Sequence, residues 1–177
     1  MKNLIACLYV TLVLFCGLAH GGPYEDGVFA KEHSDYVTAL KLLQPLALQG
    51  HANAQYNLGN MYRKGQGVKQ DYSEAVKWYK LSAAQGVVSA IFYLGDMYRK
   101  GQGVTEDYAE AIKWYRLAAA QSSSNAQFAL GVMYEKGQGV KQDDAEAIKW
   151  YRLSAAQGDT VAQAKLSEMT QGQFRKK

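Results

Sequence analysis

Residues 52–87 read ANAQYNLGNMYRKGQGVKQDYSEAVKWYKLSAAQGV, and the same pattern recurs without a gap in residues 88–123 and 124–159. Of the 36 positions in this unit, 20 carry the same residue in all three copies. A fixed period of this length is the signature of a repeat protein, in which each unit is one supersecondary structure that packs on its neighbours. The pattern therefore predicts a solenoid of repeated units rather than a single globular core.

Each unit has the pattern of two helices joined by a glycine-containing loop. In the first unit Ala54, Leu58 and Tyr62 recur every four residues, which places them on one apolar stripe of a helix. Gly65 ends this helix, because glycine readily adopts the left-handed conformation of a helix C-terminus. The second helix begins after Asp71, which precedes a glutamate by three residues as in a capping box. The sequence thus predicts an all-α fold of antiparallel helix pairs.

Two details of the first helices need an explanation in the tertiary structure. Gly59, Gly95 and Gly131 stand in mid-helix, where glycine costs about 1 kcal/mol relative to alanine. We expect a neighbouring helix to approach closely there, with Trp and Tyr rings filling the adjoining space. The residues expected to cap the starts of the later first helices are Ser123 and Asp159, whereas Val87 is a poor cap.

The two ends of the repeat region are irregular. Residues 24–51 predict a helix pair that lacks the four-residue loop extension of the other units, and Pro45 is expected to interrupt its second helix. Residues 160–170 predict a lone capping helix that covers the open end of the stack. Residues 171–177 are polar and basic, and predict a disordered tail.

Residues 1–19 have the pattern of a secretory signal peptide. A basic Lys2 precedes an apolar run that is short for a transmembrane helix, and small residues follow it. Cleavage after Ala19 is expected, with cleavage after Gly21 as the alternative. Both cysteines, Cys7 and Cys16, lie in this segment, so a mature chain would have no disulfide, thiol nucleophile or thiolate metal site. We expect a secreted or periplasmic protein without stable membrane insertion after cleavage.

Composition and motifs argue against several classes of function. The net charge of +4 is small and comes from mixed signs, and the Lys-Trp-Tyr-Lys pattern at 77–80 fits core packing better than nucleic-acid binding. The Lys-Gly-Gln-Gly-Val loops lie between helices and so do not resemble a phosphate-binding loop. The three histidines lack metal-ligand spacing, and no Ser-x-x-Lys signature occurs. We therefore predict no catalytic residue, no metal and no cofactor.

The repeat unit resembles the Sel-one-like repeat (SLR) of the tetratricopeptide-like superfamily. The resemblance rests on A-x-x-x-L-G-x-M-Y-x-K-G-Q-G-V followed by D-x-x-E-A-x-K-W-Y-x-L-x-A-A-Q, and covers about residues 24–170. It implies a right-handed α-solenoid whose first helices line the concave face, and a role as an adaptor in protein complexes. Penicillin binding has been claimed for cysteine-rich members of the family, but the repeats here contain no cysteine.

Positions that differ between copies mark a candidate binding surface on the first helices, opposite the apolar stripe. Aromatic and arginine side chains there can anchor a peptide, and amides can pair with its backbone. The alternative is that the aromatic residues at 56, 92 and 128 pack between adjacent helices. One position of the first helix holds arginine in the first two units and Glu135 in the third, which predicts a face that is basic toward its N-terminal half and mixed in charge toward its C-terminal half. The candidate partner-binding residues are Asn53, Tyr56, Asn60, Arg63, Phe92, Tyr93, Asp96, Arg99, Asn125 and Phe128.

These observations favour an exported, monomeric, non-catalytic scaffold that binds a protein or peptide. One alternative is a cell-wall or β-lactam-acting hydrolase, which the absence of Ser-x-x-Lys and of repeat cysteines disfavours. Another is a purely structural protein of the cell envelope with no ligand in its groove.

Overall fold

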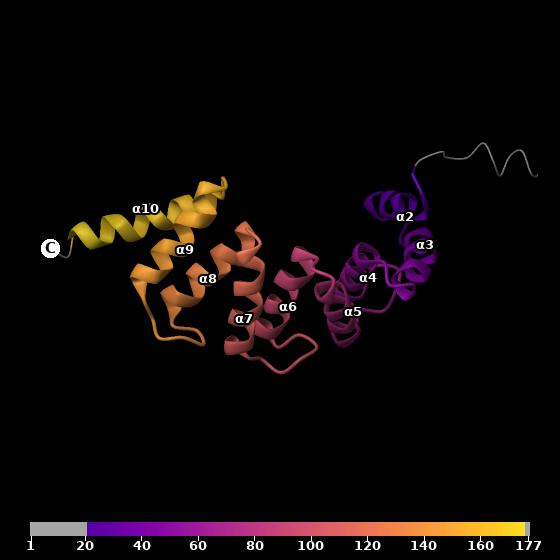
Figure 1. The fold of residues 1–177 in the computed structure, drawn as a ribbon, viewed down its shortest axis with the longest axis horizontal. Coiled ribbons are helices and arrows are strands. Elements are labelled where there is room, and N and C mark those ends of the chain that lie inside the picture. Colours follow the sequence, from indigo (N-terminus) through magenta and orange to yellow (C-terminus); the bar gives the residue numbers. More distant parts are fainter. Residues whose placement is uncertain (1–20, 176–177) are drawn as a thin grey trace, which may run out of the picture.

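A computed structural model describes residues 21–175 of the 177-residue chain, and its side chains up to residue 171. Every regular element in this part of the chain is an α-helix (Figure 1). The predicted signal peptide, residues 1–19, lies outside the described residues. The helices form four pairs and a final single helix: α2 (Pro23–Glu32) with α3 (Tyr36–Leu48), α4 (Ala52–Lys64) with α5 (Tyr72–Ala84), α6 (Val88–Lys100) with α7 (Tyr108–Ala120), α8 (Ser124–Lys136) with α9 (Asp144–Ala156), and α10 (Thr160–Arg175).

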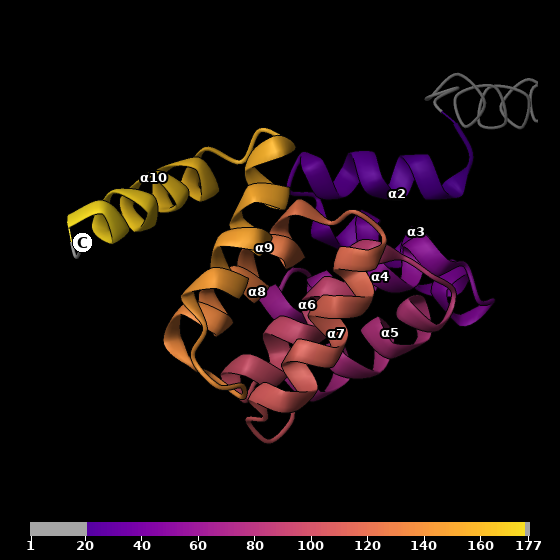
Figure 2. The same cartoon turned by 60° about the vertical axis from the view of Figure 1, so that its left-hand side comes forward.

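Each helix packs chiefly on the helices that precede and follow it in the chain. The chain therefore progresses from α2 at one end of the stack to α10 at the other, as Figure 1 shows. In Figure 2 the stack curves, so that α2 and α10 both lie on its upper side. This arrangement confirms the expected all-α solenoid of helix pairs.

The helix ends follow the capping pattern of the sequence. Gly65 and its two counterparts end α4, α6 and α8 in the left-handed conformation, with φ of 63–68°. Ser123 accepts a hydrogen bond from the first turn of α8, and Asp159 does the same for α10. Val87 provides no side-chain cap for α6. At α4 the cap is His51, whose Nδ1 accepts from the amide of Ala54 at 3.2 Å, although histidine is not among the residues that usually cap a helix N-terminus.

The mid-helix glycines make room for buried tyrosine rings. A Cβ atom on Gly59 would lie 2.8 Å from Cδ1 of Tyr79, and one on Gly131 would lie 2.6 Å from Cδ1 of Tyr151. The tyrosines at these positions are almost completely buried. The expected close approach of the second helix is therefore confirmed, and the ring that requires it is the tyrosine. The neighbouring tryptophans also pack on the core, although only Trp78 is fully buried and the other two are half-buried.

The two ends differ from expectation in detail. The first pair is joined by three residues instead of the seven of the repeats, as predicted from the missing loop extension. Helix α3 continues through Pro45 to Leu48, because a proline in the last turn removes only one hydrogen bond of the helix. Helix α10 continues past residue 170 to Arg175, since the intervening residues hold no proline and only one glycine.

Candidate functional site

A pocket of about 320 Å³ opens between α6 and α8, the first helices of the second and third repeats. Its floor includes Tyr115 of α7, which is identical in all repeats, while most of its walls come from positions that differ between repeats. Half of the ten predicted binding residues line it. The lining residues are Phe92, Asp96, Arg99, Tyr115, Asn125, Phe128, Ala129 and Val132.

An ion-pair cluster forms the polar side of this pocket. The guanidinium of Arg99 donates from Nη2 to Asp96 Oδ1 at 2.6 Å and from Nε to the hydroxyl of Tyr115 at 3.3 Å. Lys100 donates to the other oxygen of Asp96 at 2.6 Å. Burial would raise the pKa of Asp96, but the hydrogen bonds from Lys100 and Arg99 outweigh it and lower that pKa. Asp96 therefore stays ionised, and both of its oxygens are engaged within the protein.

Aromatic side chains form the apolar side of the pocket. The ring of Phe92 packs on Tyr115 at a centroid distance of 5.6 Å, and Phe128 packs on Tyr151 at 5.5 Å. Both phenylalanines are half-buried. They pack between helices and also line a hollow open to solvent. Packing between adjacent helices and a role in anchoring a partner are therefore compatible at these aromatic positions.

The corresponding space between α4 and α6 is filled by side chains of the protein itself. Asn60 is buried, and its Oδ1 accepts from the hydroxyl of Tyr79 at 3.0 Å and from Arg63 at 3.2 Å. The ring of Tyr93 stacks on that of Tyr79 with centroids 5.6 Å apart, and the guanidinium of Arg63 lies over the Tyr93 ring, 4.7 Å from its centroid. Tyr56 packs against both tyrosine rings at 6.1 Å. These predicted residues therefore form an internal cluster, whereas Asn53 lies exposed near the start of α4.

The arginines are more constrained than the sequence suggested. The sequence predicts that Arg63 and Arg99 are available to anchor a partner. Both instead donate to a buried tyrosine hydroxyl and to a side chain one turn earlier. Replacing them would break these internal hydrogen bonds, so the melting temperature should fall. At the equivalent position Glu135 accepts from the hydroxyl of Tyr151 at 2.5 Å.

Three residues of the pocket were absent from the predicted set. Tyr115 was assigned to the scaffold because it is identical in all repeats, and Ala129 and Val132 have small apolar side chains. Ala129 could have been found from the sequence, since the same position holds Asn57 in the first repeat and Tyr93 in the second. A change from a large side chain to a small one at one repeat position is the signal of an empty space.

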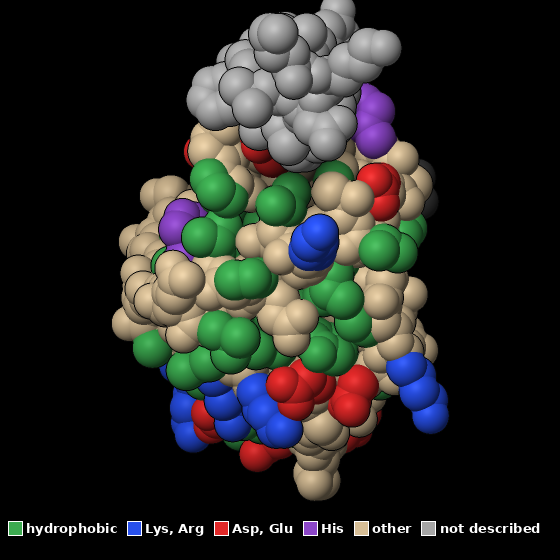
Figure 3. Space-filling view, turned by 90° about the vertical axis from the view of Figure 1, so that its right-hand side faces the viewer, with side chains coloured by type: hydrophobic (Ala, Val, Ile, Leu, Met, Phe, Trp, Pro, Cys, Tyr) green, Lys and Arg blue, Asp and Glu red, His purple; other side chains and the backbone are tan. Residues whose placement is uncertain are grey.

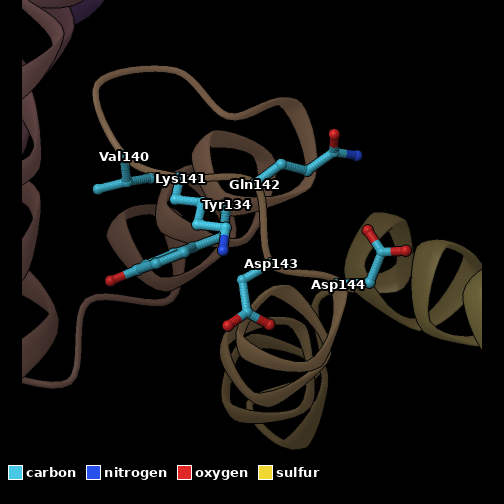
Figure 4. A pocket seen from close by; sticks show the side chains of 6 residues that line it. All are labelled: Tyr134, Val140, Lys141, Gln142, Asp143 and Asp144. Carbon is cyan, nitrogen blue, oxygen red and sulfur yellow. The ribbon is translucent and has the colours of Figure 1, made fainter.

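Two other hollows lie near the ends of the solenoid. One, of about 600 Å³, surrounds the loop between α8 and α9 (Figure 4). In the earlier repeats the next loop covers this place, with Gly139 against Tyr108. The other, of about 330 Å³, lies beside α2 and α3 at the N-terminal end, where Figure 3 shows hydrophobic side chains gathered and where Val37 is 76% exposed. Within residues 21–175 no further repeat covers either hollow, whereas the α6–α8 pocket lies between two repeats.

The described part of the chain offers no features of two other kinds of site. Residues 21–171 hold no cluster of three or more His, Cys, Asp or Glu side chains that could bind a metal ion. None of the helices within residues 21–175 is both long and apolar enough to cross a membrane.

Comparison with known proteins agrees with the internal repeats. The Sel1 repeat model matches residues 17–51, 52–87, 88–123 and 124–159. The chain belongs to the Sel1 repeat family. The resemblance seen in the sequence is therefore confirmed, and the irregular first helix pair counts as a Sel1 repeat as well. Sel1 repeats mediate protein–protein interactions, and members of the family are typically non-catalytic scaffolds.

Solved structures support this assignment. A protective antigen of uropathogenic Escherichia coli with an SLR fold is 41% identical over 76% of this chain and 29% of its own, with a TM-score of 0.74. A Sel1 repeat protein of Oxalobacter formigenes is 39% identical over 81% of this chain and 58% of its own, with a TM-score of 0.76. The present Sel1 repeat chain thus spans less than two thirds of either relative.

A more distant structure shares only the fold. Cysteine-rich protein B of Helicobacter pylori is 20% identical, with a TM-score of 0.54, over 85% of this chain and 98% of its own. No curated protein matches the chain.

Proposed function

We propose that this Sel1 repeat protein is an exported, non-catalytic scaffold that binds a segment of another protein along its first helices, centred on the α6–α8 pocket. The observation that carries the proposal is the position of this pocket. It opens where the repeats differ from one another, while the identical positions are used to pack the solenoid. A hollow with aromatic walls and a charged rim is also the usual form of an anchoring site at protein interfaces.

The chemistry of the lining suits a peptide rather than a small polar metabolite. Phe92 and Phe128 offer apolar surface, and Asn125 presents an exposed amide near the mouth. An amide can donate to and accept from a peptide backbone. Arg99 and Lys100 carry two positive charges beside the single negative charge of Asp96. A partner segment with a carboxylate near the anchor would therefore be favoured in orientation and in association rate.

Partner capture tests the proposal directly. Immobilised protein comprising residues 20–177 should retain a specific partner from a cell-envelope extract, and Asn125→Glu should weaken this capture without changing the melting temperature. The matched control is Asn53→Glu, which makes the same change at the equivalent exposed position two repeats earlier. Loss of capture with Asn53→Glu alone would place the binding site in the N-terminal half and contradict a site centred on α6 and α8.

Export and the absence of catalysis are separate parts of the proposal. N-terminal sequencing of the exported protein should begin at His20 or Gly22, as the small residues after the apolar run suggest. Recovery of an intact, membrane-embedded form that begins at Met1 would contradict cleavage. The purified protein should be monomeric in light scattering and should not turn over nitrocefin, whereas turnover would favour the hydrolase alternative.

A further inference from the structure

One position of the first helices reaches back toward the preceding repeat at each junction of the solenoid. The position is 36 residues apart in successive units and is occupied by Asn57, Tyr93, Ala129 and Lys165. The residue it faces on the preceding first helix is Lys31, Arg63, Arg99 and Glu135, in the same order. Comparing the four junctions shows what normally fills this space.

At three of the four junctions a side chain spans the gap. Asn57 accepts a hydrogen bond from Lys31 and donates to the hydroxyl of Tyr24 at 3.2 Å. Lys165 donates to Glu135 at 3.0 Å. The remaining case is Tyr93, whose ring stacks on Tyr79 and has the guanidinium of Arg63 over it. Hydrogen bonding, charge pairing and aromatic stacking are thus three solutions to one packing problem.

The remaining junction, between α6 and α8, has no such side chain. Ala129 ends at its methyl group, and the α6–α8 pocket lies over it. The other members of the Tyr93 arrangement are still present, because Tyr115 corresponds to Tyr79 and Arg99 corresponds to Arg63. Arg99 even donates to the hydroxyl of Tyr115 as Arg63 does to that of Tyr79, at 3.3 and 3.0 Å. The pocket therefore keeps the arginine and the buried tyrosine of the Tyr93 site but has no ring of its own at residue 129.

We propose that this pocket receives one aromatic side chain of the protein partner, which packs over Ala129 beside the guanidinium of Arg99. The inference rests on the proposed function and specifies how the partner is anchored. Offset stacking and a cation over the ring face both favour an aromatic group at such a place. The ring edges would meet the apolar walls formed by Phe92 and Phe128.

The other two solutions do not suit this junction. A lysine would meet the positive Arg99, where Lys165 meets the negative Glu135. An amide would lack the hydroxyl that Tyr24 offers to Asn57, because the equivalent residue here is Phe92. Asp96 is a poor substitute for that hydroxyl, since Arg99 and Lys100 already donate to its two oxygens. An aromatic ring is therefore the side chain that this lining selects.

The direct test uses N-acetyl-L-tyrosinamide as the probe, titrated to about 20 mM because a single side chain supplies only weak affinity. The methyl resonances of Ala129 and Val132 should shift upfield as the ring enters the pocket. N-acetyl-L-alaninamide and N-acetyl-L-lysinamide are the matched probes without a ring and should leave these resonances in place. Equal shifts with the three probes, or no shift with tyrosinamide, would overturn the proposal.

A pair of variants ties the probe to the empty position. Ala129→Tyr should fill the pocket with its own ring and abolish the tyrosinamide shift at Val132, whereas Ala129→Ser should retain it. Tyr93→Ala should create a second, equivalent pocket between α4 and α6, with a second set of probe shifts there. Near-ultraviolet circular dichroism verifies that each variant is folded. If Tyr93→Ala does not fold, the comparison at residue 129 still decides the question.

Capture of the partner separates this inference from the proposed function. If both hold, Ala129→Tyr should reduce capture at least tenfold and Ala129→Ser should not. If Asn125→Glu abolishes capture while Ala129→Tyr leaves it intact, the first helices bind a partner without an aromatic side chain in the α6–α8 pocket. The inference is then wrong, although the proposed function stands.

Discussion

Gly95 of α6 lies against the ring of Tyr115 of α7 so closely that a Cβ atom on residue 95 would stand 2.6 Å from Cδ1 of the ring. Gly95→Ala should therefore destabilise the protein, although alanine is the better helix former by about 1 kcal/mol. Overpacking of a filled core costs about 1–3 kcal/mol, so the net loss should be up to about 2 kcal/mol. Urea unfolding followed by circular dichroism measures it.

The control is the same substitution in a Tyr115→Ala background. With the ring removed, Gly95→Ala should become neutral or stabilising, because only its effect on helix propensity remains. A cost of equal size in both backgrounds would show that the ring contact is not the reason for glycine at this position.

The loop glycines should differ according to what lies beside them. Gly103 has a φ of 72°, and a Cβ atom there would overlap the backbone of Tyr72 in the preceding repeat. Gly86 has a φ of 84°, but a Cβ atom would meet open space. Gly86→Ala should cost about 1–2 kcal/mol from backbone strain alone. Gly103→Ala should cost more, because the loop must also move away from its neighbour.

Thermal unfolding of the two variants measures this difference. A chain of this size loses about 2–4 °C of melting temperature per kcal/mol. Equal melting temperatures would mean that the loop does not transmit packing between repeats.

The start of α6 should be the easiest helix end to stabilise. Its N-cap, Val87, makes no side-chain hydrogen bond, while Ser123 caps α8 at the equivalent position. Val87→Ser should gain up to about 1 kcal/mol from the new cap, reduced by the loss of the apolar contacts of valine. Amide hydrogen exchange in the first turn of α6 should slow.

The reverse change, Ser123→Val, serves as the matched comparison and should speed exchange in the first turn of α8. If exchange in both turns were insensitive to the cap residue, packing on the neighbouring helices alone would hold these helix ends.

Acid should weaken the solenoid through two clusters of partly buried ion pairs, at Asp96 and at Glu135. Burial opposes ionisation of Asp96 and Glu135, but hydrogen bonds from basic side chains, and from Tyr151 for Glu135, lower the pKa of both carboxyl groups. A lowered pKa in the folded state contributes stability that is present above the unfolded pKa, about 4 for these residues, and is lost as the pH falls further. The melting temperature should therefore be nearly level from pH 7 to 5 and fall below about pH 4.

The Asp96→Asn and Glu135→Gln double variant should melt lower at pH 7 and show a smaller fall in acid. Asp144→Asn, which removes an exposed carboxylate, serves as the control and should follow the parent curve. An unchanged acid dependence in the double variant would assign the loss of stability to other carboxylates.

Much of the fold could be predicted because the same local signals for helices and helix ends occur in each of the three repeats. The apolar stripe with Leu58, the left-handed Gly65 and the cap at Asp71 all recur at the same spacing, and each acts within a few residues of chain. Even the close approach at Gly59 followed from the cost of glycine in a helix. The continuation of α3 through Pro45 was missed, because helix packing outweighs the loss of one hydrogen bond.

The candidate site was predicted only in part. The sequence placed Phe92, Asp96 and Arg99 on the correct face of a helix, because facing depends on the helical period alone. It did not show that Arg63 is held by Tyr79, or that Tyr93 fills one junction while the next lies open over Ala129. Helix, loop and repeat order arise from interactions between residues close in the chain. Whether a side chain closes or lines a pocket depends on distances between successive repeats, which arise only when the helices stack.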